Sequence, residues 1–216
     1  MQELVSSADL FFLKEHPVTY FLLRDNEDPV DTARPVVSLP IGHKPWPSSS
    51  MNRFRYFADH AKAFSGCSHL FYVDVDCRFV GAVDVVSELV GVRHCGFTQG
   101  GGPFERDRRS CLYADPVCFK HYYGGGFSGG ARESYLRLSK WCADKIEEDT
   151  CRGIVPIYHD ETALNRYFLD VPPTVSLDPG YHYPSADLER YRRLWAPQDY
   201  VPKILLLDKN HAELRG

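Results

Sequence analysis

Short apolar runs alternate with segments of helical period along this chain, and this alternation constrains its fold more than any other feature. Six runs are rich in β-branched and aromatic residues and are predicted to be strands. They are residues 18–23, 36–39, 70–73, 154–157, 174–177 and 204–207. Several are apolar without alternation, as expected for strands covered on both faces. Strands interleaved with helices predict an α/β fold with a mostly parallel central sheet flanked by helices.

Three helices are predicted from apolar residues spaced three or four apart. The first is capped by residues 48–50 and ends at Gly66, the second begins near Ala131, and the third covers about residues 161–169. Their inward faces consist of Phe54, Phe57, Ala61 and Phe64 in the first helix and of Tyr135, Leu138, Cys142 and Ile146 in the second. Ligands of such sheets bind beyond the carboxyl ends of the strands, so candidate site residues are sought there.

The composition indicates one folded domain over residues 1–216, with 44% hydrophobic and 25% charged residues. A net charge of −4 argues against sequence-wide binding to nucleic acid. The seven cysteines include no C-x-x-C pair, which excludes a zinc ribbon and favours scattered buried thiols over a disulfide framework. The sequence contains no run of about 18 apolar residues, and therefore no transmembrane segment is predicted.

The sharpest chemical signal follows the predicted strand at 70–73, where Asp74 and Asp76 flank Val75. Because side chains in a strand alternate, both carboxylates point to the same side. Two like charges held together favour a cation between them, and hard oxygen ligands suit Mg²⁺ or Mn²⁺ that also binds a diphosphate. The alternative is a solvated Asp-x-Asp turn. A second alternative keeps the metal but predicts a phosphohydrolase.

A second group of polar residues comprises Tyr158, His159, Asp160 and Glu161, between an apolar run and a predicted helix. A carboxylate at this edge could act as a base, a nucleophile or a stabiliser of an oxocarbenium-like centre. Equally, Asp160 could cap the helix while Glu161 interacts with its dipole. The sequence leaves both interpretations open.

Two glycine clusters and the C-terminal end complete the candidates. Residues 100–102 are predicted to form a mobile loop tip. Residues 124–130 follow two tyrosines and precede a helix, and they form either a site of close ligand approach or a plain turn. Lys209, His211 and Arg215 belong either to a disordered basic tail or to a tail that folds over a phosphate.

Together these motifs resemble glycosyltransferase family 6, the retaining enzymes that include the ABO blood-group, α-1,3-galactosyl- and Forssman-type transferases. The motifs that carry the resemblance are residues 46–53, 74–76, 94–97, 122–130 and 159–165, and residues 209–211 with Arg215. Their order and spacing match from about residue 10 to the end. The strings H-D-E-x-x-L-N and Y-Y-x-G-G-F-x-G-G are specific to this family, whereas D-x-D alone is not.

The resemblance implies a GT-A-type nucleotide-sugar-binding fold. It also implies Mn²⁺-dependent transfer (Mg²⁺ being possible) of galactose or N-acetylgalactosamine from a UDP-sugar, in α-1,3 linkage, to an oligosaccharide of a glycolipid or glycoprotein. Asp74 and Asp76 would hold the metal, and Glu161 would be the catalytic carboxylate beneath the anomeric carbon. Donor binding is implied for Arg53, Val75, Gly124, Gly125, Gly126, Asp160, Lys209 and Arg215. Acceptor binding is implied for His94 and Tyr158.

The chain departs from the family pattern at several places. The family's first strand and uridine-binding loop, like its stem and membrane anchor in the Golgi, would precede residue 1. Tyr158 stands where relatives carry Trp, and no acidic residue occurs near residues 181–184, where one is expected to bind the acceptor. An impaired or truncated member acting as a glycan- or nucleotide-binding module is therefore the alternative. Because residues 124–126 are all glycine and carry no Cβ, an acetamido group of the donor is expected to fit.

Overall fold

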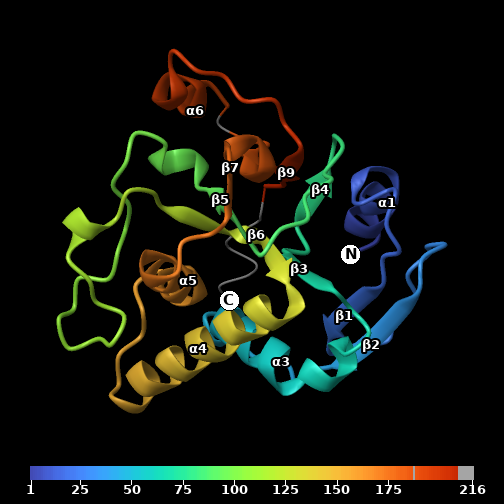
Figure 1. Cartoon of the computed structure of the whole chain (residues 1–216), viewed down its shortest axis with the longest axis horizontal. Helices are drawn as coiled ribbons and strands as arrows, with labels where there is room; N and C mark the ends of the chain where they lie inside the picture. The colour runs from blue at the N-terminus through green and yellow to red at the C-terminus, as the bar shows by residue number, and fades with distance from the viewer. Residues whose placement is uncertain (187, 209–216) are drawn as a thin grey trace.

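The computed structural model describes residues 1–186 and 188–208 (Figure 1). Its helices are α1 (Gln2–Phe11), α2 (Ser48–Met51), α3 (Arg53–Asp59), α4 (Arg132–Cys151), α5 (His159–Asp170) and α6 (Leu188–Trp195). Its strands are β1 (Tyr20–Arg24), β2 (Val36–Pro40), β3 (His69–Val73), β4 (Cys77–Phe79), β5 (Leu89–Arg93), β6 (Tyr123–Ala131), β7 (Val175–Leu177), β8 (Tyr183–Pro184) and β9 (Ile204–Leu206). Short 3₁₀ turns are η1 (Ala61–Phe64), η2 (Cys95–Phe97), η3 (Pro116–Cys118) and η4 (Pro179–His182).

The central sheet has the strand order β3-β6-β5-β7 and is mixed. Strand β6 is antiparallel to both of its neighbours, and only β5 and β7 are parallel. Two smaller sheets flank it, a parallel pair β1-β2 and a mixed sheet β4-β9-β8. The α/β class predicted from the sequence is confirmed, but the prediction of a mostly parallel sheet is wrong. Residues 124–130, for which a site of close ligand approach and a plain turn were left open, belong to the antiparallel strand β6 inside the sheet.

Close packing explains why β6 is rich in glycine. All its residues from Tyr123 to Gly130 are buried. A Cβ on Gly129 would lie 2.2 Å from the Phe71 ring and 2.6 Å from the Leu70 carbonyl oxygen, and one on Gly130 would lie 2.3 Å from the Glu88 carbonyl oxygen. Glycine is ordinarily depleted in strands, but here it lets neighbouring chain segments approach β6 closely.

Side chains cover both faces of the central sheet, as the apolar strand runs predicted. On one face α3, α4 and α5 form a core with β3 and β6, in which Phe54, Tyr135, Leu138 and Leu164 have no exposed surface. Figure 1 shows α3 and α4 side by side below the strands. The other face is covered by the end of α1 and by β4 and β9; its buried residues include Phe12, Phe79, Val90, Val92, Phe127 and Ile204.

Most predicted elements are present, with one clear exception. Residues 154–157 are irregular rather than a strand, and Val155 and Ile157 are exposed. Pro156 lacks the N–H that a ladder requires, and its carbonyl instead accepts a hydrogen bond from the amide of His159. The predicted first helix is divided into α2, α3 and η1. Within the described residues, no helix has both the length and the apolarity needed to cross a membrane.

Candidate active site

The candidate site lies where the C-terminal end of β3, the first half of β6, α3 and the N-terminus of α5 meet. The amide of Asp74, just after β3, donates to the Gly126 carbonyl oxygen at 3.0 Å. Opposite Gly91 and Val92 of β5 the register of β6 jumps from Ser128 to Gly124, so the β6 residues between them have no partner on β5. This bulge turns backbone groups of β6 toward side chains of α3 and α5.

Gly125 is the backbone centre of the site. Its N–H donates to Glu161 Oε2 at 2.7 Å, and its carbonyl oxygen accepts from Arg53 Nη1 at 2.7 Å. A Cβ at this position would lie 3.1 Å from the Arg53 guanidinium and 3.4 Å from Asp160 Oδ2, so both groups face the glycine. The bulge thus brings together Arg53, Asp160 and Glu161, three residues for which the family resemblance implied roles at the donor sugar.

Arg53 and Asp160 form a buried ion pair. Arg53 Nη2 lies 2.7 Å from Asp160 Oδ2, and both residues are less than 10% exposed. The guanidinium also lies over the rings of Tyr72 and Phe54, at 4.5 and 4.8 Å from their centroids. Burial raises the pKa of Asp160 to about 6, although the charge of Arg53 opposes this change. The pair is therefore ionised at neutral pH and fixed in position.

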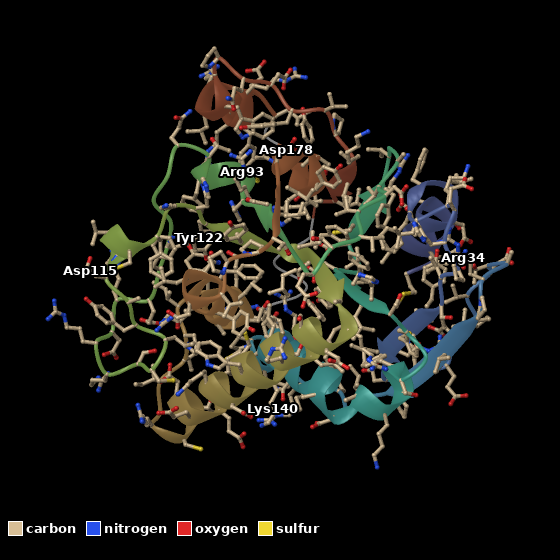
Figure 2. All side chains as sticks on the ribbon, in the orientation of Figure 1. Arg34, Arg93, Asp115, Tyr122, Lys140 and Asp178 are labelled. Atoms are coloured by element: carbon tan, nitrogen blue, oxygen red, sulfur yellow. The ribbon has the colours of Figure 1, made fainter. Side chains whose placement is uncertain are left out.

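Glu161 lies beside this pair with a strongly shifted pKa. Burial raises the pKa of its carboxyl group to about 7, and the negative charge of Asp74 acts in the same direction. The Tyr122 hydroxyl, the Gly125 N–H and the charge of Arg53 oppose the increase. Figure 2 shows Tyr122 close to α5. A buried carboxyl group poised between its two protonation states is typical of a catalytic position.

Backbone strain and a buried amide fix the start of α5. His159, directly before Asp160, has a φ of 51°, a conformation that non-glycine residues rarely adopt and that is enriched at functional sites. Its ring contacts that of Trp46, with centroids 4.9 Å apart. Asn165, which is 2% exposed, donates to the Tyr123 and Glu161 carbonyl oxygens and accepts from the Tyr123 N–H. Asn165 therefore joins α5 to the first residue of β6.

The two aspartates of the predicted metal site follow β3, but they lie in the turn to β4, where the Cys77 N–H donates to the Asp74 carbonyl oxygen at 3.0 Å, so strand alternation does not set their directions. The Tyr72 hydroxyl donates to Asp74 Oδ1 at 2.5 Å, and both aspartates are partly exposed. Asp74 raises the pKa values of Asp160 and Glu161, so its negative charge reaches both groups. Among the described residues of the site, the carboxylates of Asp74, Asp160 and Glu161 outnumber the guanidinium of Arg53. A pair of hard oxygen ligands in such surroundings fits Mn²⁺ or Mg²⁺, which keeps further positions for water or phosphate oxygens.

The space next to the glycines at 124 and 126 differs from the sequence-based expectation. A Cβ on Gly124 or Gly126 would lie 2.8–3.0 Å from the imidazole ring of His182. The space that was expected to admit an acetamido group is therefore filled by His182, whose ring packs against these two glycines. The absence of side chains at 124 and 126 is explained by this packing, and it no longer argues for a particular donor.

The remaining predicted residues lie around this centre or outside the described chain. Tyr158 is 48% exposed directly before α5, and Val75 is 55% exposed between the aspartates. His94 follows β5, where its Nδ1 accepts from the Gly96 N–H, and burial lowers its pKa to about 4. Lys209, His211 and Arg215 lie outside the described residues.

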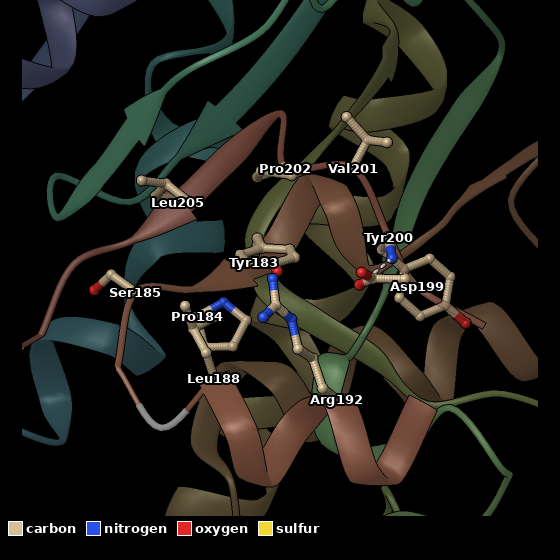
Figure 3. A pocket seen from close by; sticks show the side chains of 10 residues that line it. All are labelled: Tyr183, Pro184, Ser185, Leu188, Arg192, Asp199, Tyr200, Val201, Pro202 and Leu205. Atoms are coloured by element: carbon tan, nitrogen blue, oxygen red, sulfur yellow. Dashed lines mark hydrogen bonds between the residues drawn. The ribbon is translucent and has the colours of Figure 1, made fainter. Parts of the chain in front are cut away.

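Sequence reasoning missed several residues that shape the site: Tyr72, Tyr122, Asn165 and His182. Asn165 could have been found, because it lies four residues after Glu161 in the H-D-E-x-x-L-N string. His182 carries no local signal, since only the fold brings it to β6. A separate groove between β8 and α6 is lined by Tyr183, Leu188 and Arg192, among others, and contains none of the predicted site residues (Figure 3).

Comparison with known proteins defines the class of this protein. The family model of glycosyltransferase family 6 matches residues 1–215, and the chain therefore belongs to this family, which confirms the resemblance seen in the sequence.

Several curated relatives are similar over nearly the whole chain. It is 28% identical to the human globoside alpha-1,3-N-acetylgalactosaminyltransferase 1 over 100% of its own length and 64% of that protein. It is 30% identical to the histo-blood group ABO system transferase 1 of Rattus norvegicus, over 98% of the chain and 63% of the relative. The human alpha-1,3-galactosyltransferase 2 is 26% identical over 91% of the chain and 63% of the relative. The chain thus spans slightly less than two thirds of the length of these relatives.

Proposed function

We propose that this chain carries the catalytic centre of a retaining hexosyltransferase that transfers galactose or N-acetylgalactosamine from UDP to a glycan acceptor in α-1,3 linkage. The observation that carries the proposal is the buried Glu161 carboxyl group, oriented by the Gly125 N–H beside the Arg53–Asp160 ion pair. The names of the relatives support the sugars and the linkage, because they describe α-1,3 transfer of these two sugars.

The geometry suggests a role for each side chain in this reaction. Cleavage of the bond between sugar and UDP develops positive charge at the anomeric carbon, and an ionised Glu161 would stabilise that charge. The hydrogen bond from Gly125 fixes the Oε2 atom, so little reorganisation accompanies the reaction. Asp160, held by Arg53, would accept hydrogen bonds from hydroxyl groups of the donor sugar.

Asp74 and Asp76 are the residues that would hold Mn²⁺, as the proposed cofactor. When bound, the ion would supply positive charge that offsets the charge on the UDP leaving group. On the acceptor side, His94 and the exposed ring of Tyr158 would contact the glycan, since aromatic faces pack well against sugar rings. As the cellular location we propose the Golgi lumen, in line with the family resemblance.

Donor turnover without an acceptor tests the proposal. The chain is incubated with Mn²⁺ and either UDP-galactose or UDP-N-acetylgalactosamine, and release of free sugar and UDP is measured. We expect slow hydrolysis of one or both donors. Binding of UDP without turnover of either donor would instead favour the binding module, and release of phosphate from simple phosphoesters would favour the phosphohydrolase.

A further inference from the structure

Three side chains that commonly bind transition metals meet outside the carboxylate site. They are His94 and Cys95 at the start of η2 and His182 at the end of η4. One potential ligand atom of each lies within 4.8 Å of those of the other two, and no other group of three such residues occurs in the described part of the chain. The proposed transfer reaction uses His94 as an acceptor contact, but it uses neither Cys95 nor the Nδ1 atom of His182.

Burial makes this cluster unusual. Cys95 is 2% exposed and His182 is 6% exposed, and the Nδ1 atom of His182 has neither solvent contact nor a hydrogen-bond partner. A buried polar atom without a partner is unfavourable, because it has lost its hydrogen bonds to water without a replacement, and such atoms are rare in folded proteins. A lone pair on this nitrogen is the donor that a metal ion needs.

The surrounding structure holds the cluster in place. The His182 ring packs between Gly124 and Gly126 of β6, where a Cβ would come within 3.0 Å of it. On the other side, the Trp195 indole N–H of α6 donates to the Cys95 carbonyl oxygen at 2.8 Å. The ring centroids of His94 and His182 are 5.3 Å apart. Side chains from two distant turns are thus directed into one small volume.

We propose that His94, Cys95 and His182 bind a divalent ion of the zinc type, with Zn²⁺ as the best match. Two imidazole nitrogens and a thiolate favour Zn²⁺ over Mg²⁺ or Mn²⁺, which prefer oxygen ligands such as Asp74 and Asp76. Three protein ligands leave a fourth position for water. This site is therefore chemically distinct from the aspartate pair.

Binding requires modest rearrangement. Ligand atoms around tetrahedral zinc are about 3.5 Å apart, so the cluster must contract by at most about 1.3 Å from the observed separation. The Cys95 thiol releases its proton to solvent as the metal–sulfur bond forms. If His94 binds the ion through Nδ1, this atom gives up the hydrogen bond that it accepts from the Gly96 N–H. The bound ion would join η2 to η4.

Cobalt substitution tests the site directly, because Co²⁺ bound by a thiolate gives a charge-transfer absorption band. The full chain is freed of metal by dialysis against a chelator and titrated with Co²⁺, then with Zn²⁺ in competition, without donor or acceptor. We expect the thiolate band to appear and to reach saturation, and Zn²⁺ to remove the band by displacing Co²⁺. Cys95→Ser should abolish the band, and His182→Gln should weaken Zn²⁺ binding at least tenfold.

Two control variants separate this site from others. Cys118→Ser removes an exposed thiol, and Asp76→Asn alters the aspartate pair; both should keep the band and the wild-type zinc affinity. If Cys95→Ser does not fold, zinc-edge X-ray absorption of the wild-type chain still tests the proposal, because it reports the ligands of the bound ion. One sulfur and two imidazole ligands are expected. The proposal would be overturned if the wild-type chain gave no band or if Cys118→Ser lost it. It would also be overturned by a zinc spectrum without a sulfur ligand, or by a Zn²⁺ affinity that is unchanged in His182→Gln. Since no step involves the donor, failure of the transferase proposal would leave this result unaffected.

Discussion

At the scale of single residues, the Glu161 carboxyl group is held where its charge is disfavoured. Its pKa is raised from 4.5 to about 7, chiefly by burial. A carboxyl group whose pKa is higher in the folded state loses stabilisation as pH rises from the unfolded value to the folded one. The contribution of Glu161 to the stability of the fold therefore decreases between about pH 4.5 and pH 7. The ionised group is then ready to meet positive charge.

A neutral side chain at this position should consequently stabilise the metal-free protein. We expect Glu161→Gln to raise the free energy of unfolding by a few kcal/mol at pH 8, and the gain to vanish below about pH 4. Urea unfolding at a series of pH values measures this. The matched control is Glu15→Gln, an exposed carboxylate whose replacement should change stability by less than about 0.5 kcal/mol. A Glu161→Gln variant that is less stable than wild type at pH 8 would contradict the assigned environment.

The aspartate pair gives a second prediction at this scale. Asp76→Asn removes one negative ligand, so Mn²⁺-dependent affinity for UDP should fall at least tenfold, or about 1.4 kcal/mol, while the fold is retained. Calorimetric titration of UDP with and without Mn²⁺ measures the effect. Asp84→Asn, at an exposed carboxylate, serves as the control and should bind like wild type. Equal UDP affinity in Asp76→Asn and wild type would remove the metal assignment.

At the scale of elements, β6 determines both the sheet and the site. Its glycines permit close packing on Leu70 and Phe71, and its bulge releases the Gly125 backbone to bind Arg53 and Glu161. The same strand therefore serves as the centre of the core and as one wall of the candidate site. A change in its packing should affect stability first and activity second.

Adding one methyl group to β6 tests this packing. We expect Gly129→Ala to destabilise the fold by about 1–3 kcal/mol or more, because its Cβ would overlap the Phe71 ring and the Leu70 carbonyl. Thermal and urea unfolding measure the change. Gly66→Ala is the control, since no atom lies within 4 Å of its Cβ position, and it should be near neutral. Equal stability of the two variants would show that β6 packs differently.

The sequence predicted those elements whose local pattern and tertiary role agree. The apolar stripe of α4 predicted its buried Tyr135, Leu138 and Cys142 correctly. Residues 124–130 were not predicted to be a strand, because such a glycine run normally indicates a turn or a site of close ligand approach, whereas tertiary packing makes them a strand. The prediction of a strand at 154–157 was wrong for the opposite reason. The apolar composition suggested a strand, but Pro156 lacks an N–H and the side chains of Val155 and Ile157 are exposed.

At the scale of the whole molecule, the candidate site draws on α3, β3, β6 and α5, which are far apart in the sequence. The sequence indicated Asp74, Asp160 and Glu161 individually, because carboxylates after apolar runs are visible as a local pattern. It could not show that Arg53 pairs with Asp160 or that His182 fills the space beside the glycines, since both contacts depend on the complete fold. The family resemblance implied donor binding for Arg53, and the structure shows its ion pair with Asp160.

The central claim is that Glu161 carries the chemistry of glycosyl transfer, and the turnover of UDP-galactose and UDP-N-acetylgalactosamine by Glu161→Gln tests it most directly. The rate constant kcat for sugar release or transfer is compared with wild type, with UDP affinity measured in parallel. Because the carboxylate acts mainly as charge develops on the sugar, we predict that kcat falls more than tenfold while UDP affinity stays close to wild type. A kcat within about tenfold of wild type, a barrier change below about 1.4 kcal/mol, would contradict the account and assign the chemistry to another group.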